Sequence, residues 1–412
     1  MSRTTDSQLL PTRSLLAVLL TACALVAGCS ATGPDGGDGP IRIGGSLGLT
    51  GSLAAPAAEY HAIYDAWAED VNARGGLLGR KVEMDIKNDS STAAGAATQY
   101  QTLLTKDQVD LVLAPYSTFV GAAVVPIVKS SGKLMFNGGF PDTGLSDAAG
   151  GRMLTAYPYQ PQDYTKGMFS AVAELPEQSR PKTVAILTNN NPFTLDVRDG
   201  HDGVGGARAY ALDAGMSVVF DETYNAETGD FTGVVGKAKA SGADLFLVLG
   251  LPEDTTTILK ATRTVGYQPK LVCACGSQVI TLPSWKDLGP ATEGVVGGTG
   301  SWPSQNFPGT DALVRISQGR GETVIPAYSA VAFASLQILE QAVQGAGTLD
   351  QEKIKDFAYS HTFETVVGPI RFEPNGTASY RQVLLQTVDG EVTPVWPKDV
   401  AQTGLRTTAA AP

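Results

Sequence analysis

The sequence predicts an α/β protein built from two parallel-sheet lobes. Short apolar strand patterns alternate with helix patterns along most of the chain, which is typical of parallel sheets covered by helices on both faces. The alternation stops and restarts near Lys182, which indicates a second lobe. No low-complexity segment separates the two runs, which favours lobes joined by crossing strands over lobes joined by a flexible tether.

The first run begins at residue 41 and ends near residue 139. Its first helix pattern places Tyr60, Ile63, Tyr64 and Trp67 three or four residues apart and stops at a Gly-Gly pair, which suits a helix C-terminus. Strands are predicted over 41–49, 81–89, 109–115 and 133–139, and helices over 60–71, 93–106 and 120–131.

The second run repeats this rhythm. Strands are predicted over 183–190, 217–224, 243–250 and 269–276, with one long helical stretch that reaches Ala214 and helices over 230–242 and 252–266. Late helices are predicted over 327–344 and 349–359, and a strand with a turn over 369–376.

The N-terminus has the order of an export signal. Arg3 and Arg13 precede an apolar run over 15–26, which is too short for a comfortable permanent membrane span. Val26-Ala27-Gly28-Cys29 is similar to a bacterial lipobox, which implies a signal peptide over 1–28 and a lipidated Cys29 that anchors the protein to the outer face of a membrane. The Gly/Pro/Asp-rich segment up to residue 40 is then a flexible tether.

Charge and composition exclude several classes of function. The formal net charge of -11 and the pI near 4.8 argue against a nucleic-acid partner. Cys273 and Cys275 are predicted to be small buried residues without a bridge, since a disulfide between residues i and i+2 is strained. With scattered histidines and no other cysteine in the mature chain, we expect no metal site and no cofactor.

One match to a catalytic motif lacks the structural context that the motif requires. The segment 44–48 matches G-x-S-x-G around Ser46, yet no helix pattern begins directly after the serine as a nucleophile elbow requires. The sequence therefore predicts that the protein is not an enzyme.

Polar and aromatic residues gather where predicted strands end. Ligands bind outside the carboxyl ends of parallel strands, where helix N-termini offer free N–H groups. Tyr116, Ser117 and Thr118 follow one such strand, and the two hydroxyls suit a carboxylate or other small anion, although one of them could simply cap its helix. The segments 137–142, 189–193, 250–254 and 275–278 follow other strands, and each is either a binding loop or an ordinary turn.

With these residues and patterns, the chain resembles the type I periplasmic binding proteins of branched-chain amino acid and amide ABC transporters. The likeness covers nearly the whole mature chain, and its most distinctive part is the Asn-x-x-Gly-Gly-x-x-Gly-x-x pattern over 72–81. The resemblance implies two doubly wound lobes joined by three crossing strands, near 156–159, 294–300 and 369–372. It places lobe 1 at 41–157 plus 297–369, lobe 2 at 158–296 plus 370–400, and a tail at 401–412.

The resemblance also implies a ligand clamped between the lobes and delivered to an ABC permease by a monomer. Family positions for ligand contact fall on Ser117, Thr118, Gly139, Phe140, and near Phe193 and Leu251. The default ligand is a branched-chain or other apolar amino acid; the alternatives are an amide, urea or an aromatic carboxylate, or a sensory role for the same cleft.

Two departures from the family pattern concern the ligand. A family threonine is replaced by Pro141, and the glutamate that pairs with a ligand ammonium falls at about Cys275 or Gly276. Because a buried ammonium needs a partner, Asp142, Glu253 or Asp254 are the candidate substitutes. Cys275 is itself predicted as a ligand contact.

Overall fold

The computed structural model describes residues 39–157, 159–225, 228–322, 324–378 and 381–407. These residues belong to one compact unit. The predicted signal peptide, the lipidated Cys29 and nearly all of the tether lie outside the described residues, so they stay predictions. None of the helices within the described ranges has the length and apolar character that a membrane crossing demands.

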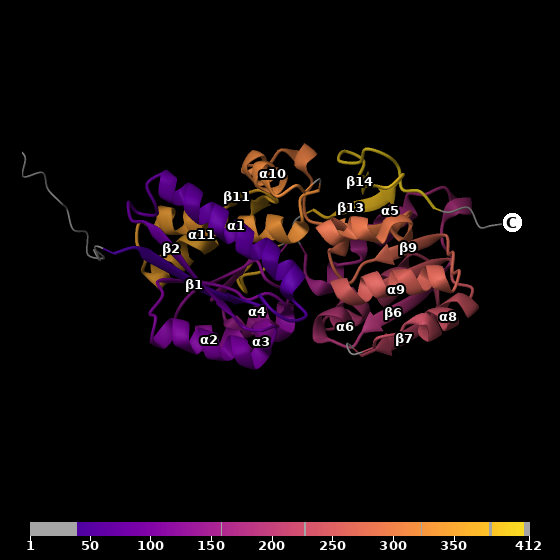
Figure 1. Ribbon diagram of the computed structural model, residues 1–412, viewed down its shortest axis with the longest axis horizontal. Coiled ribbons are helices and arrows are strands. Elements are labelled where there is room, and N and C mark those ends of the chain that lie inside the picture. The colour runs from indigo at the N-terminus through magenta and orange to yellow at the C-terminus, as the bar shows by residue number, and fades with distance from the viewer. Residues whose placement is uncertain (1–38, 158, 226–227, 323, 379–380, 408–412) are drawn as a thin grey trace, which may run out of the picture. The chain divides into compact units, whose positions relative to one another are not determined.

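The first sheet is parallel throughout and has the strand order β2-β1-β3-β4-β5. Helices from two distant parts of the chain cover it, and Figure 1 shows the late helix α11 beside the early helix α1. The strands are β1 (Ile41–Leu47), β2 (Val82–Asn88), β3 (Leu111–Leu113), β4 (Met135–Asn137) and β5 (Met153–Thr155). The helices are α1 (Ala54–Ala73), α2 (Ala93–Thr105), α3 (Thr118–Ser130), α4 (Thr143–Ala149), α10 (Thr310–Gly319), α11 (Ala327–Ala346) and α12 (Gln351–Ser360).

The Asn/Gly pattern over 72–81 forms the turn from α1 into β2. The side chain of Asn72 accepts a hydrogen bond from the amide of Val82 at 2.7 Å and donates one to the Val82 carbonyl at 2.9 Å. Gly76 has φ of 80°, and a Cβ there would lie 1.8 Å from the carbonyl oxygen of Arg80. The pattern therefore fixes where the first helix ends and where the second strand starts.

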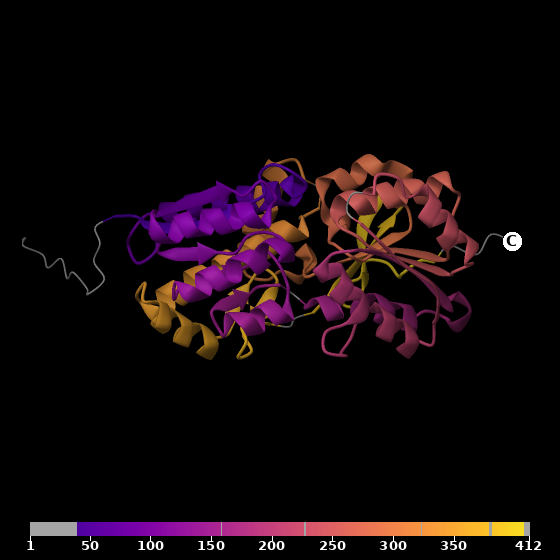
Figure 2. The ribbon, with the colours of Figure 1, turned by 90° about the horizontal axis from the view of Figure 1, so that it is seen from below.

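The second sheet has the order β14-β13-β10-β9-β8-β6-β7. Its core is parallel, but β13 pairs antiparallel with β10, and β14 pairs antiparallel with β13. These two antiparallel strands were not predicted from the sequence. The yellow C-terminal strands lie among the magenta-to-orange elements of this sheet in Figures 1 and 2. The strands are β6 (Thr183–Asn189), β7 (Ser217–Tyr224), β8 (Leu245–Leu249), β9 (Leu271–Ala274), β10 (Val295–Thr299), β13 (Val383–Val388) and β14 (Glu391–Trp396).

The helices of this half are α5 (Lys166–Ala173), α6 (Pro192–Asp199), α7 (Ala207–Asp213), α8 (Thr232–Ala240) and α9 (Pro252–Thr264). A small hairpin of β11 (Phe363–Thr365) and β12 (Gly368–Ile370) completes the described strands. The α/β class and the two-sheet arrangement are confirmed. The exact lobe boundaries stay predictions, and β10 continues through the expected boundary at residue 297.

One predicted helix is wrong. The stretch to Ala214 is not one helix but α6 and α7, with a turn between them in which His201 and Val204 pair as a short bridge. Gly200 and Gly206 have φ of 82° and 89°, and a Cβ on Gly206 would lie 2.3 Å from the amide nitrogen of Gly200. The glycines therefore break the helix.

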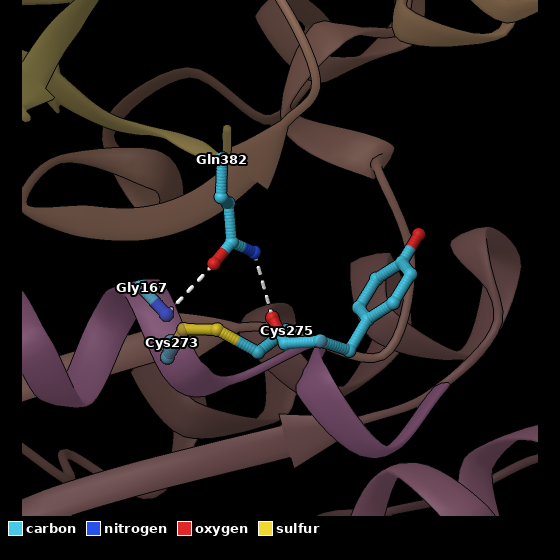
Figure 3. Close-up of a disulfide and its surroundings, with 5 residues drawn as sticks. Gly167, Cys273, Cys275 and Gln382 are labelled. Carbon is cyan, nitrogen blue, oxygen red and sulfur yellow. Dashed lines mark hydrogen bonds between the residues drawn. A yellow bond between two sulfur atoms is a disulfide. The ribbon is translucent and has the colours of Figure 1, made fainter. Parts of the chain in front are cut away.

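Cys273 and Cys275 form a disulfide, so the prediction of two unbridged residues is wrong (Figure 3). Cys273 lies in β9 and Cys275 directly after its end, and their Cα atoms are 5.3 Å apart, within the usual range for a bridge. Gln382 lies beside the bridge in Figure 3, and its side-chain oxygen accepts a hydrogen bond from the Gly167 amide at 2.7 Å. Because its sulfur is bonded to Cys273, Cys275 offers no free thiol to a ligand.

Candidate functional site

A narrow cleft at the carboxyl ends of strands is lined by residues from both sheets. Its free volume is about 40 Å³, and none of the described residues that line it carries a charge. Seven of the ten predicted contact residues line it: Tyr116, Ser117, Thr118, Gly139, Phe140, Phe193 and Leu251. Asp142, Glu253 and Cys275 are not among the lining residues.

The N-terminus of α3 forms one end of the cleft. Ser117 occupies the N-cap position with φ of 82°, yet its side chain makes no capping hydrogen bond. Thr118 Oγ1 lies 3.4 Å from the Pro141 carbonyl, a long contact. The capping interpretation therefore does not account for Ser117, and its hydroxyl lies beside helix N–H groups that favour an anion.

Asn137 holds the neighbouring loop in place. Its side-chain oxygen accepts hydrogen bonds from the amides of Gly139 and Phe140 at 3.0 and 3.1 Å, and its amide donates to the Phe140 carbonyl at 2.7 Å. A Cβ on Gly139 would lie 1.9 Å from the Pro115 carbonyl oxygen, so this loop and the start of α3 pack backbone against backbone. Asn137 thus positions two of the predicted contacts.

Aromatic rings from both sheets form the walls. On one side Tyr116 meets Tyr328 edge-on at 5.5 Å between centroids, and on the other Tyr164 meets Phe193 edge-on at 5.2 Å. Burial raises the pKa of Tyr116 and of Tyr328, so both phenols stay neutral. Tyr157, Tyr164 and Tyr328 line the cleft but were not predicted as contacts, because they come from a crossing segment, a short connection and a distant helix rather than from strand ends.

The three candidate partners for a ligand ammonium are not among the residues that line the cleft. Asp142 caps α4, since its Oδ1 accepts a hydrogen bond from the Leu145 amide at 2.7 Å, and burial raises the pKa of its carboxyl group. Asp254 accepts hydrogen bonds from Asn189 Nδ2 at 2.6 Å and from the Tyr224 hydroxyl at 3.2 Å. Glu253 is exposed in the first turn of α9.

One buried hydroxyl in the cleft is free for a ligand. Ser277 is 5% exposed and lines the cleft, and among the described residues its Oγ has no hydrogen-bond partner. A buried hydroxyl without a partner is unfavourable, so a bound solute is its natural complement. The segment 275–278 was singled out in the sequence, but Ser277 itself was not.

A larger cavity of about 470 Å³ lies elsewhere, where residues of the segment 280–286 face Arg320, Gly321, Glu322, Val324 and Val392. We assign the candidate site to the smaller cleft because strand ends, a helix N-terminus and unpaired hydroxyls converge there. Across the described ranges, no group of three or more His, Cys, Asp or Glu side chains is arranged to hold a metal ion.

Comparison with known proteins places this geometry in context. A family model described as "Periplasmic binding protein" matches residues 40–391. The Leu/Ile/Val-binding protein homolog 7 of Brucella abortus (strain 2308) is 21% identical over 404 residues, covering 94% of this chain and 98% of that protein. A leucine-, isoleucine-, valine-, threonine-, and alanine-binding protein of Pseudomonas aeruginosa is 23% identical over 346 residues, covering 80% of this chain and 86% of that protein.

Solved structures share the fold. A branched-chain amino acid transporter substrate binding protein from Streptococcus pneumoniae, in complex with isoleucine, aligns with a TM-score of 0.73 at 21% identity over 87% of this chain and all (100%) of that one. An ABC transporter solute binding protein from R. palustris, in complex with benzoate, aligns with a TM-score of 0.75 at 14% identity over 90% of this chain and 98% of that one.

Proposed function

Because this chain belongs to the periplasmic binding protein family, we propose that it is the solute-binding subunit of an ABC importer. It captures a small organic solute in the cleft between its two sheets and presents the loaded form to a membrane permease. The role is binding without chemical conversion, so the protein is not an enzyme.

The observation that carries this proposal is the cleft itself. Residues from both sheets meet there, with hydrogen-bonding groups at the N-terminus of α3 and aromatic rings on both walls. This combination suits a solute with a polar, hydrogen-bond-accepting end and an apolar body. The free volume of about 40 Å³ is near that of one water molecule, so a solute enters only when the walls separate. Hinge motion of this kind is a known mode of ligand capture.

The solute panel follows from the sequence and the relatives. Branched-chain and other apolar amino acids are the default, and amides, urea and aromatic carboxylates are the alternatives. A thermal-shift screen of residues 39–412 against this panel identifies binders, since a ligand at 100 times its dissociation constant adds about 2.7 kcal/mol to the free energy of unfolding.

Ser117→Ala tests whether the cleft is the site. We expect it to weaken a bound carboxylate about tenfold, because it removes one hydrogen bond to a charged group. Ser130→Ala, at the exposed far end of α3, is the matched control and leaves affinity unchanged. Equal affinity of the Ser117 variant and the parent protein would remove the α3 end from the site.

We also propose that Cys29 is lipidated and holds the protein on the extracytoplasmic face of the membrane. Expressed in a bacterium that processes lipoproteins, the full chain fractionates with membranes, and Cys29→Ala moves it to the soluble fraction. Retention of the variant in membranes would contradict the anchor.

A further inference from the structure

We infer that the solute is an organic acid without an ammonium group: a monocarboxylate whose body is an aromatic ring or a branched alkyl group. This inference rests on the proposed function, and it narrows the class of solute that the cleft accepts.

The described residues that line the cleft carry no acidic side chain. Asp142 caps α4, Asp254 binds Asn189 and Tyr224, and Glu253 is exposed to solvent in the first turn of α9. An amino acid ligand would bury its ammonium group without a carboxylate partner, which is strongly unfavourable.

The loop after β9, which contributes Gly276 to the cleft, presents no acidic group there. Cys275 is bound to Cys273, so its sulfur faces the buried bridge. A Cβ on Gly276 would lie 2.2 Å from the Gly250 amide nitrogen and 2.4 Å from the Leu249 carbonyl carbon. The backbone therefore leaves no room for any side chain at residue 276, and a carboxylate cannot be presented there without moving the strand ends.

Hydrogen-bond donors are available at the α3 N-terminus, at Ser117 and at the unpaired Ser277 Oγ, and these suit an anionic end. The remaining surface is aromatic, with Tyr116 and Tyr328 on one wall and Tyr164 and Phe193 on the other. Such walls suit a flat or branched apolar body.

The test uses matched sets of solutes that differ only at the polar end. We would measure dissociation constants of residues 39–412 by calorimetry for leucine, 4-methyl-2-oxopentanoate, 4-methylpentanoate and 4-methylpentanamide. The aromatic set is phenylalanine, 3-phenylpropanoate, benzoate and benzamide. In at least one set, we expect the carboxylate without ammonium to bind about 100-fold more tightly than the amino acid.

Each outcome separates the inference from the proposed function. If an amino acid binds as tightly as its oxo or deamino counterpart, the inference is wrong and the solute-binding function stands. If the amide matches the carboxylate, the anionic seat at α3 is wrong. If no solute of either set binds, both the inference and the assignment of the cleft as a solute site fail.

A gain-of-function variant gives a second readout. Ser277→Asp places a carboxylate at the cleft and is expected to reduce the preference for the deamino acid over the amino acid at least tenfold. Ser217→Asp, exposed at the start of β7, is the control with unchanged preference. Ser277→Asp could keep both the melting temperature of the parent and its preference for the deamino acid over the amino acid. That result would show that the cleft does not select solutes by the absence of an ammonium group.

Discussion

Glu59 is a buried carboxyl group outside the cleft, and it shares one cation with a second carboxylate. Arg320 donates hydrogen bonds to Glu59 Oε1 at 2.9 Å and to Glu322 Oε1 at 2.6 Å, and Ser329 donates to Glu59 Oε2 at 3.1 Å. Desolvation and the neighbouring Glu322 raise the pKa of Glu59 above 4.5, against the opposing effect of Arg320. The folded chain therefore holds a proton on Glu59 at pH values where the unfolded chain has released it.

The raised pKa of Glu59 makes the free energy of unfolding depend on pH. As the pH rises from 4.5 through the raised pKa of Glu59, the free energy of unfolding falls relative to that of Glu59→Gln, with a slope no steeper than about 1.4 kcal/mol per pH unit. Urea unfolding from pH 4 to pH 8 measures the difference between the two proteins. Glu177→Gln, at an exposed position, is the control and runs parallel to the parent. A parallel curve for Glu59→Gln as well would mean that Glu59 ionises normally in the fold.

Arg320 is the second residue-level test. Arg320→Leu leaves Glu59 and Glu322 without their cation and is expected to lower the free energy of unfolding by about 3 kcal/mol at pH 7.5. Arg381→Leu removes the exposed pair with Asp399 and is expected to leave the free energy of unfolding nearly unchanged. Similar losses in the two variants would show that the buried pair contributes no more than a surface one.

Among the secondary-structure elements, α3 is the one that most directly shapes the cleft. It approaches the next loop so closely that a Cβ on Gly121 would lie 2.3 Å from the ring of Phe140. Phe140 is buried and lines the cleft, so it cannot move without changing the site. The packing of α3 on this ring therefore depends on a glycine inside a helix.

Gly121→Ala tests that contact. Overpacking is expected to lower the free energy of unfolding by about 1 to 3 kcal/mol, which exceeds the gain from a better helix former, and to weaken the solute found in the screen. Gly236→Ala, in α8 with no atom within 4 Å of the added Cβ, is the matched control and is expected to raise stability by about 0.5 to 1 kcal/mol. Equal stabilisation in both variants would show that Phe140 has room to shift.

The helices and strands that were predicted correctly are those with a clear local sequence pattern. β1, α2, β8 and α9 follow directly from apolar periodicity and glycine punctuation. The hairpin of β13 and β14 was missed, although Asp389-Gly390 between two apolar runs is a local hairpin signal. Its place beside β10 depends on pairing across about 90 residues, which no local pattern records. The site divides in the same way: Ser117 and Phe140 lie at strand ends and were predicted, whereas Tyr164 and Tyr328 reach the cleft only through the tertiary fold.

For the molecule as a whole, the two sheets share a hydrophobic core. One cluster of buried residues contains Tyr60 and Phe136 of the first half together with Trp285, Val295 and Leu385 of the second. Trp285 also donates a hydrogen bond to Thr387 Oγ1 of β13 at 2.9 Å, which ties the segment before β10 to the returning strand. A core that crosses from one sheet to the other predicts that the halves lose structure together.

Equilibrium unfolding in urea tests this coupling. We expect tryptophan fluorescence, which reports on Trp67 in α1 and on Trp285, Trp302 and Trp396 later in the chain, to follow the same single transition as far-ultraviolet circular dichroism. A solute at 100 times its dissociation constant should shift the whole transition by about 2.7 kcal/mol, because it contacts both sheets. Two separated transitions, of which the solute moves only one, would show that the halves unfold independently and that the shared core contributes little to holding the cleft together.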